Sequence, residues 1–354
     1  MIGGLNRRDF LAGLSCATGG AVCGCASRVA HAKGARQAPP RFMWAYLAHF
    51  GMKLWESRLH YADLKVDDSM WKSMTEKAAE IGVNTLVVDL GEGMVFESHP
   101  ELSVRGSWSP DRMRAEIARL KSMGVMAIPK LNFSSSHDQW LGKWRSYLST
   151  PEYFRVCSEI IADVADVFDE TPFFHIGYDE ESHFIQDYNK FEYIRLRTGN
   201  LWWHDFLWFV AEVERHGMRP WIWSDYCWFH RESFLARMPR SVLQSNWYYG
   251  GGFDAAKLSD QRRPELVTYQ TLEEGRYDQV PCGSTYEDAA NFGRTVEYCR
   301  REISSGRLKG FLMAPWYYRT MEDKRGKIMA SLKVMGDEIR KWNASDVQVA
   351  EEVL

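Results

Sequence analysis

The sequence predicts an α/β fold, a single-domain (β/α)8 TIM barrel, from three observations. Eight short apolar runs of strand length recur along the chain. Segments with helical, 3.6-residue periodicity separate most of these runs. The series fits within about 300 residues, which is the size of one such barrel. A doubly wound open sheet is the alternative arrangement of the same alternating elements.

The predicted strands are apolar runs bounded by polar loops, as expected for buried parallel strands. In chain order they are residues 42–50, 85–90, 125–133, 173–176, 220–223, 242–247, 279–282 and 311–316.

Two of the intervening helices have clear ends. The stretches 67–82 and 109–124 each begin with Asp or Ser, continue with apolar residues at helical spacing and end at glycine. Asp and Ser accept hydrogen bonds from free N–H groups at a helix start, and glycine tolerates the backbone that ends a helix. We therefore predict a helix in each stretch.

The N-terminus has the features of an export signal. Arg7 and Arg8 form a twin-arginine pair, a weakly apolar Gly/Ala-rich stretch follows, and Ala30-His31-Ala32 supplies a small-x-small cleavage site. We expect a Tat signal peptide over residues 1–32 and a periplasmic or extracellular mature protein. A lipid anchor at Cys25 stays open, although the residues before it fit a lipid-attachment site poorly.

The rest of the chain divides simply. We expect a linker over residues 33–40, the barrel over 41–342 and a frayed tail over 343–354. No apolar run after the signal is long enough to span a bilayer, so no integral membrane span is predicted. The cysteines at 157, 227, 282 and 299 show no zinc-site spacing, and their disulfide pairing cannot be read from the sequence.

Composition excludes some partners and favours another. The formal charge of -3, with scattered Lys and Arg, gives no basic field for a nucleic acid. The chain carries 15 Trp, 16 Tyr and 18 Phe. Because aromatic rings stack on the apolar faces of sugars, a carbohydrate is the favoured ligand.

Carboxylates and aromatic side chains gather where the predicted strands end. In a barrel these ends meet at one face, which is where barrel enzymes carry their active sites. The clearest case is the stretch 173–181, an apolar run that ends in Asp179, Glu180 and Glu181. These acids are either an acid/base pair or a helix N-terminus, where acids are also favoured. The other strand-end residues that we assign to a sugar pocket are His49, Asp89, His137, Trp223, Trp247, Tyr286, Asp288 and Trp316.

The sequence resembles a known family along most of residues 80–320. His175-Ile176-Gly177-Tyr178-Asp179-Glu180 is similar to the His-x-Gly-Gly-Asp-Glu signature of family 20 glycoside hydrolases, the β-N-acetylhexosaminidases. Further segments resemble the family in the same order: His99-Pro100-Glu101-Leu102, the run 124–129 with His137, Tyr286-Glu287-Asp288, and the pocket tryptophans Trp223, Trp247 and Trp316.

The resemblance implies substrate-assisted retaining hydrolysis of an amino-sugar glycan, without a cofactor or metal. Glu180 would protonate the glycosidic oxygen and later deprotonate water, while the sugar's own acetamido oxygen attacks the anomeric carbon. Asp179 would hold the acetamido N–H, and Tyr286 would bind the acetamido oxygen. Neighbours on a regular strand point to opposite faces, so Asp179 and Glu180 share a pocket only if the chain turns at the strand end.

The sequence also departs from the family pattern. The family's arginine near the end of the first strand is absent, with His49 nearest in register. Lys130 and Asn132 stand where acidic residues are typical, and Tyr178 replaces the second glycine of the signature. A non-catalytic carbohydrate-binding barrel and a glycosidase acting on a sugar without an acetamido group are therefore kept as alternatives.

Several residues have simpler interpretations. His175 is expected to be structural beneath the acids, and Glu181 to be a helix cap. A metal site from His175, Asp179 and His183 is disfavoured because its spacing crosses the end of a strand. No dinucleotide or phosphate loop is present in the sequence.

Overall fold

A computed structural model describes residues 36–51, 62–189, 191–316, 320 and 322–352. The predicted signal peptide, its Arg7–Arg8 pair and Cys25 lie outside this range.

Eight parallel strands form a barrel, which confirms the predicted fold class. Their hydrogen-bonded order is β6-β5-β4-β3-β2-β1-β8-β7. Isolated parallel bridges between Gln244 and Gln279 and between Trp247 and Cys282 join the β6 and β7 sides, so the barrel is nearly closed. The strands are β1 (Met43–His49), β2 (Thr85–Asp89), β3 (Met126–Lys130), β4 (Phe173–Gly177), β5 (Arg219–Trp223), β6 (Leu243–Ser245), β7 (Cys282–Gly283) and β8 (Gly310–Met313).

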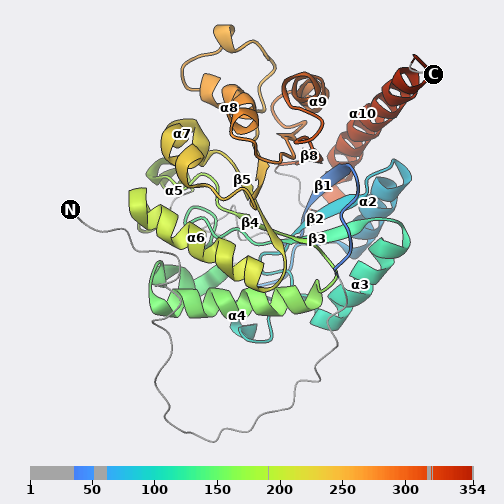
Figure 1. Cartoon of the computed structure of the whole chain (residues 1–354). Helices are drawn as coiled ribbons and strands as arrows, with labels where there is room; N and C mark the ends of the chain where they lie inside the picture. The colour runs from blue at the N-terminus through green and yellow to red at the C-terminus, as the bar shows by residue number, and fades with distance from the viewer. Residues whose placement is uncertain (1–35, 52–61, 190, 317–319, 321, 353–354) are drawn as a thin grey trace, which may run out of the picture. The chain divides into compact units, whose positions relative to one another are not determined.

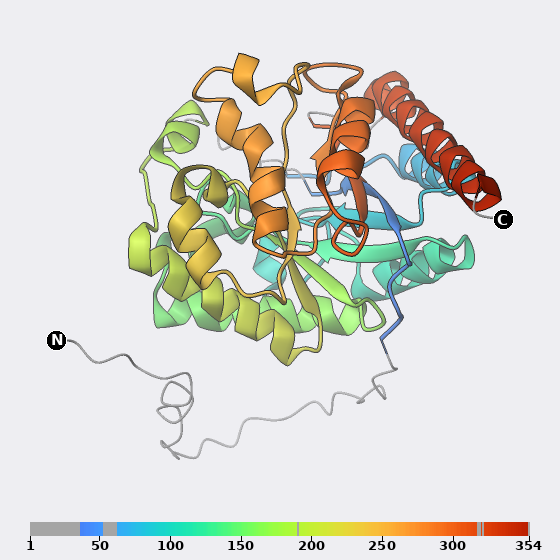
Figure 2. The same ribbon diagram turned by 45° about the horizontal axis from the view of Figure 1, so that its top comes forward.

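The helices lie outside the strands (Figure 1), and Figure 2 shows the same arrangement from a second direction. They are α2 (Asp68–Glu80), α3 (Pro110–Ser122), α4 (Pro151–Val167), α5 (His183–Tyr188), α6 (Gly199–Arg215), α7 (Tyr226–Arg237), α8 (Arg263–Glu274), α9 (Asn291–Glu302) and α10 (Arg325–Glu352), with short 3-10 turns at Pro100–Leu102, Gln139–Tyr147, Ala255–Lys257 and Glu322–Lys324. None of these helices is both long and apolar enough to cross a membrane.

The two helices with predicted ends are confirmed. The Asp67 carboxylate accepts hydrogen bonds from the N–H groups of Ser69 and Met70 and begins α2. The Ser109 hydroxyl accepts from the N–H of Arg112 and begins α3. By contrast, α10 continues to Glu352, through most of the tail predicted after residue 342, because no Gly or Pro follows Gly336 to end it.

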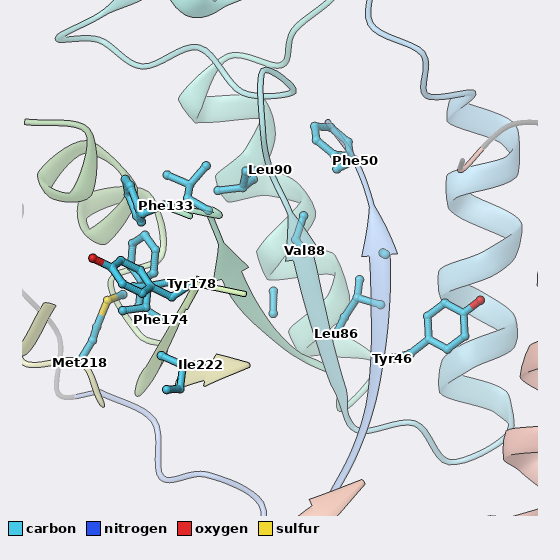
Figure 3. Close-up of a cluster of buried hydrophobic side chains, with 14 of the residues drawn as sticks. Tyr46, Phe50, Leu86, Val88, Leu90, Phe133, Phe174, Tyr178, Met218 and Ile222 are labelled. Atoms are coloured by element: carbon cyan, nitrogen blue, oxygen red, sulfur yellow. The ribbon is translucent and has the colours of Figure 1, made fainter. Parts of the chain in front are cut away.

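Alternation along the strands creates two apolar layers. Side chains such as Ala45, Leu47 and Val87 fill the barrel interior. Their neighbours, among them Tyr46 and Leu86, belong to the larger core between the strands and the helices, part of which is drawn in Figure 3. This is the period of two that a strand imposes, and it fixes which residues reach the pocket at the strand ends.

Arg36, just before β1, contacts the end of the barrel at which the strands begin. The Arg36 guanidinium donates to the main-chain oxygens of Asp169, Thr171 and His216, in the loops that lead into β4 and β5. The four cysteines within the described part of the chain are buried and free.

Candidate active site

The chain turns sharply at the end of β4. Gly177, Tyr178 and Glu180 have φ angles of 68°, 74° and 52°, in the left-handed region, and the register with β5 shifts between His175 and Gly177. This turn breaks the strand alternation, so the neighbouring side chains of Asp179 and Glu180 line the same pocket. The chain therefore turns at the strand end, as it must if Asp179 and Glu180 are to share one pocket.

Packing holds this turn in place. A Cβ on Gly177 would lie 2.2 Å from Asn132 Oδ1, so only glycine fits there. Tyr178 replaces the second glycine of the signature at a position with a positive φ. Its ring is buried against Phe206 and Trp202, and the Arg197 guanidinium lies 4.5 Å from the ring centroid. Burying this large side chain offsets the strain of its backbone.

The two carboxyls have distinct surroundings. Asp179 is buried, and its Oδ1 accepts a hydrogen bond from the Asn132 amide at 2.7 Å. Glu180 has 31% of its side chain exposed. His137 Nε2 lies 3.2 Å from Glu180 Oε2 and 3.6 Å from Asp179 Oδ2, so one imidazole faces both acids.

Electrostatics favour a charged His137. Burial lowers its pKa, but the Asp179 and Glu180 carboxylates outweigh burial and raise it to about 9. Burial, helped by the negative charge of Glu180, raises the pKa of Asp179, while His137 opposes that rise. An imidazolium at neutral pH therefore sits against the acid pair and balances its charge.

The pocket has a volume of about 450 Å³, which is within the usual range of small-molecule sites. Trp247 stacks on Tyr249 with ring centroids 5.1 Å apart, and Trp228 packs edge-on against Trp247. The predicted residues that line the pocket are His137, Asp179, Glu180, Trp247, Tyr286 and Trp316. Aromatic walls beside a carboxyl pair form the arrangement that the strand-end pattern predicts.

Four predicted pocket residues lie elsewhere. Trp223 is only 1% exposed and packs behind Trp316, with ring centroids 5.7 Å apart. Asp288 accepts from the N–H of Ala290 and pairs with Arg294 at 2.6 Å, away from the pocket wall. The remaining two, His49 and Asp89, are buried inside the barrel.

His49 and Asp89 belong to a buried ionic cluster with Lys130. Lys130 Nζ lies 2.9 Å from Asp89 Oδ1, and His49 Nδ1 lies 3.4 Å from Asp89 Oδ2. Burial raises the pKa of Asp89, but Lys130 and His49 outweigh it, so the net shift is downward. These three residues are absent from the pocket lining, so His49 does not take the place of the family's arginine as a sugar contact.

Two residues near the turn are structural. Glu181 accepts hydrogen bonds from the Arg197 guanidinium and main chain, while Ser182 caps α5. The expected role of Glu181 as a helix cap is therefore wrong. His175 is buried, its Nδ1 accepts from the N–H of Gly177, and burial lowers its pKa well below the usual value. It lies beneath the acids as a neutral side chain.

The sequence assigns no site role to four residues that contact the acid pair or line the pocket. Asp225 and Asn132 contact the acid pair directly, and both stand at predicted strand ends, which was the available signal. Glu265 and Arg262 also line the pocket. They follow the long loop after β6, where neither periodicity nor a motif marks them.

The same acid pair offers donor atoms to a cation. Within the described part of the chain, His137, Asp179 and Glu180 are the group whose ligand atoms lie close enough for a metal ion, all within 4.8 Å of one another. Binding of a metal ion there would release the proton that the two carboxylates favour on His137.

Known structures with this architecture include β-N-acetylhexosaminidases. The β-N-acetylhexosaminidase of Bacteroides fragilis NCTC 9343 is 13% identical, with a TM-score of 0.59 over 88% of this chain and 71% of that one. The family 20 exo-β-N-acetylglucosaminidase of Vibrio harveyi, in complex with N-acetylglucosamine, is 13% identical, with a TM-score of 0.55 over 85% of this chain and 54% of that one. Dispersin B is 12% identical, with a TM-score of 0.55 over 84% of this chain and 99% of that one.

No protein-family model and no curated protein matches the sequence. The predicted resemblance to family 20 catalytic barrels is thus confirmed at the level of the fold.

Proposed function

We propose that the protein is an exported glycoside hydrolase that removes a terminal β-linked N-acetylhexosamine, or a related sugar, by substrate-assisted retaining catalysis. The observation that carries this proposal is the turn after β4, which brings the adjacent carboxyls of Asp179 and Glu180 into one aromatic pocket. The structural likeness to hexosaminidases supports a glycosidase.

The surroundings of the two acids suit different roles. Glu180 is the more exposed carboxyl, so it is placed to donate a proton to the glycosidic oxygen and later to take one from water. Asp179 is buried and fixed by Asn132, which suits a carboxylate that orients the acetamido N–H. Tyr286, which also lines the pocket, would donate its hydroxyl to the acetamido oxygen.

In the first step the acetamido oxygen bonds to the anomeric carbon as the glycosidic C–O bond breaks, and the proton of Glu180 passes to the leaving oxygen. This gives an oxazolinium ion, whose positive charge the Asp179 carboxylate stabilises. Water then attacks the anomeric carbon and gives a proton to Glu180, while the bond between that carbon and the acetamido oxygen breaks; this restores both the acetamido group and the enzyme.

Export rests on the twin-arginine pattern at Arg7 and Arg8, followed by a small-x-small cleavage site. We propose a periplasmic or extracellular location on that basis. Cell fractionation, with both arginines changed to Lys as the control, checks it; a cytoplasmic wild-type protein would contradict export.

One observation favours a related sugar over N-acetylhexosamine itself. The sequence lacks the family's arginine near the end of the first strand, and His49, the nearest residue in register, is buried with Asp89 and Lys130 instead of lining the pocket, so it offers no contact to the outer hydroxyls. A glycosidase for a sugar without an acetamido group is therefore the second candidate.

Hydrolysis of aryl N-acetyl-β-glucosaminide and galactosaminide tests the proposal. We expect turnover by the wild type and a loss in kcat of about 10²- to 10⁴-fold in Glu180→Gln, because general acid catalysis contributes that much. Glu152→Gln, on the exposed first turn of α4, is the control and should keep full activity.

An oxazoline-mimicking thiazoline separates the two candidates. Inhibition supports participation of the acetamido group, whereas hydrolysis that resists the thiazoline favours the second candidate. Absence of wild-type turnover, or full activity in Glu180→Gln, would reject the acid/base assignment.

A further inference from the structure

A third carboxyl lies against the acid pair and has no role in the mechanism above. Asp225 follows β5 and is buried, with 8% of the residue exposed. Its Oδ2 accepts a hydrogen bond from the main-chain N–H of Glu180 at 2.8 Å. Its Oδ1 is buried and has no hydrogen-bond partner within the described residues.

Helix capping does not explain this side chain. Asp225 occupies the N-cap position of α7, where Asp normally accepts from the first N–H groups of the helix. Here no such side-chain bond is made. The carboxyl is directed at Glu180 instead of at its own helix.

Glu180 needs an external constraint. Its φ of 52° is left-handed, which costs a residue other than glycine about 1–2 kcal/mol. Such a conformation persists only where the surroundings impose it. The hydrogen bond from the Glu180 N–H to Asp225 is a contact of that kind, because it fixes the peptide plane that sets the direction of the Glu180 side chain.

The rest of the turn is held in the same way from the other side. Asn132, after β3, accepts from the N–H of Tyr178 at 3.0 Å and donates to Asp179. Asp225, after β5, holds Glu180. The turn after β4, which lies between β3 and β5, is therefore tied to both neighbouring strand ends, with one polar side chain for each catalytic acid.

We propose that Asp225 is a positioning residue, whose carboxyl acts through the main chain of Glu180 to keep the acid/base carboxyl in the pocket, 3.2 Å from His137. Its effect on rate rests on the hydrolysis proposed above; its effect on geometry does not.

The role of Asp225 as an acceptor sharpens the test. Burial, together with the nearby Asp179 and Glu180 carboxylates, raises the pKa of Asp225 well above its usual value. Whatever the charge of the side chain, its Oδ2 acts toward Glu180 as a hydrogen-bond acceptor. An asparagine presents the same acceptor atom at the same length.

The experiment compares Asp225→Asn with Asp225→Ala. We expect Asp225→Asn to keep kcat within a few-fold of the wild type. Asp225→Ala should lower kcat by about 10- to 100-fold with little change in KM, since a shift of about 1 Å in a reacting group costs that much. Asp254→Ala is the matched control, because it also loses one hydrogen bond to a main-chain N–H, at an exposed turn.

A second readout needs no turnover. NMR titration of His137 reports the nearness of Glu180, because that carboxylate helps to raise the pKa of the imidazole to about 9. Asp225→Ala should lower the pKa of His137, and Asp225→Asn should leave it in place. If the Ala variant does not fold, Asp225→Ser, whose hydroxyl is too short to reach the Glu180 N–H, takes its place.

The outcomes separate the two proposals. An inactive wild type rejects the proposed hydrolysis, while the His137 titration still decides the placement of Glu180. Unchanged kcat and an unchanged His137 pKa in Asp225→Ala overturn the inference. Equal damage from Asn and Ala also overturns it, because an acceptor oxygen at this position would then not be what Asp225 contributes.

Discussion

At the scale of single residues, the protonation of Glu265 makes the stability of the protein depend on pH. Its carboxyl is buried on the pocket wall, with Arg262 Nη1 at 3.4 Å. Burial raises its pKa to about 7, and Glu287 and Glu180 add to that rise while Arg262 opposes it. The folded protein therefore favours the protonated form more than the unfolded chain does.

The sign of the effect follows from this upward shift. The stability due to protonated Glu265 is fully present below about pH 4.5, the ordinary value, and is lost as the pH rises through about 7. Thermal unfolding of the wild type and Glu265→Gln between pH 4 and 8 checks it. The Tm of the wild type should fall relative to that of the variant over this range.

Glu274→Gln, on the same helix α8 with an exposed side chain, is the control and should run parallel to the wild type. Parallel curves for Glu265→Gln as well would show that Glu265 does not change its proton affinity on folding.

Residue identities in the acid pair were predictable from sequence, but backbone conformation was not. Asp179 and Glu180 stand out because three acids end an apolar run. Nothing in the sequence marks Tyr178 or Glu180 as left-handed, since both residue types normally avoid that region. Only the packed structure shows the long-range contacts with Arg197 and Asp225 that hold them there.

At the scale of elements, the β4 end depends on Gly177. Gly177→Ala adds a Cβ that would overlap Asn132 Oδ1, on top of the cost of its φ of 68°. Gly124→Ala is the matched comparison, because Gly124 has a φ of 77° and no atom near the added Cβ. The Gly124 variant should lose about 1 kcal/mol in the free energy of unfolding, from backbone strain alone.

Gly177→Ala should lose more stability than Gly124→Ala and also most of the activity, because Asn132 must move and releases Asp179. Urea unfolding together with kcat measures both effects. Equal stability losses with normal kcat in both variants would mean that the turn adapts without disturbing the acids.

The strands and the capped helices were predictable because their signals are local. Apolar runs bounded by polar loops place each strand, and caps place α2 and α3. The β7 strand is reduced to Cys282–Gly283, although an apolar run at 279–282 was predicted. Gln279 lies outside β7 and forms isolated bridges to Gln244 and Leu308. Both partners are distant in the sequence, so the local apolar run does not indicate this pairing.

At the scale of the whole molecule, barrel closure decides which strand-end residues reach solvent. His49 and Asp89 are register partners on β1 and β2, and both were predicted at the pocket. Strand periodicity gives the face of a side chain but not its depth within the barrel. The ring of Trp316 lies 5.5 Å from that of His49, which is buried. The layer that covers a residue comes from other strands, so the sequence of one strand cannot show it.

The buried cluster offers a last test at this scale. Lys130→Met leaves the Asp89 carboxylate without its cation inside the barrel and should cost about 3–5 kcal/mol in the free energy of unfolding. Asp89→Leu leaves Lys130 unpaired and should be similarly harmful. The double variant should recover much of the loss, because the barrel interior then holds two apolar side chains.

Urea unfolding of the wild type, the two single variants and the double variant gives the interaction energy between the two sites. Since neither side chain lines the pocket, the double variant should keep its KM. Additive losses would show that the pair does not stabilise the barrel through its mutual charge, and a raised KM in a well-folded double variant would place Asp89 or Lys130 back in the sugar site.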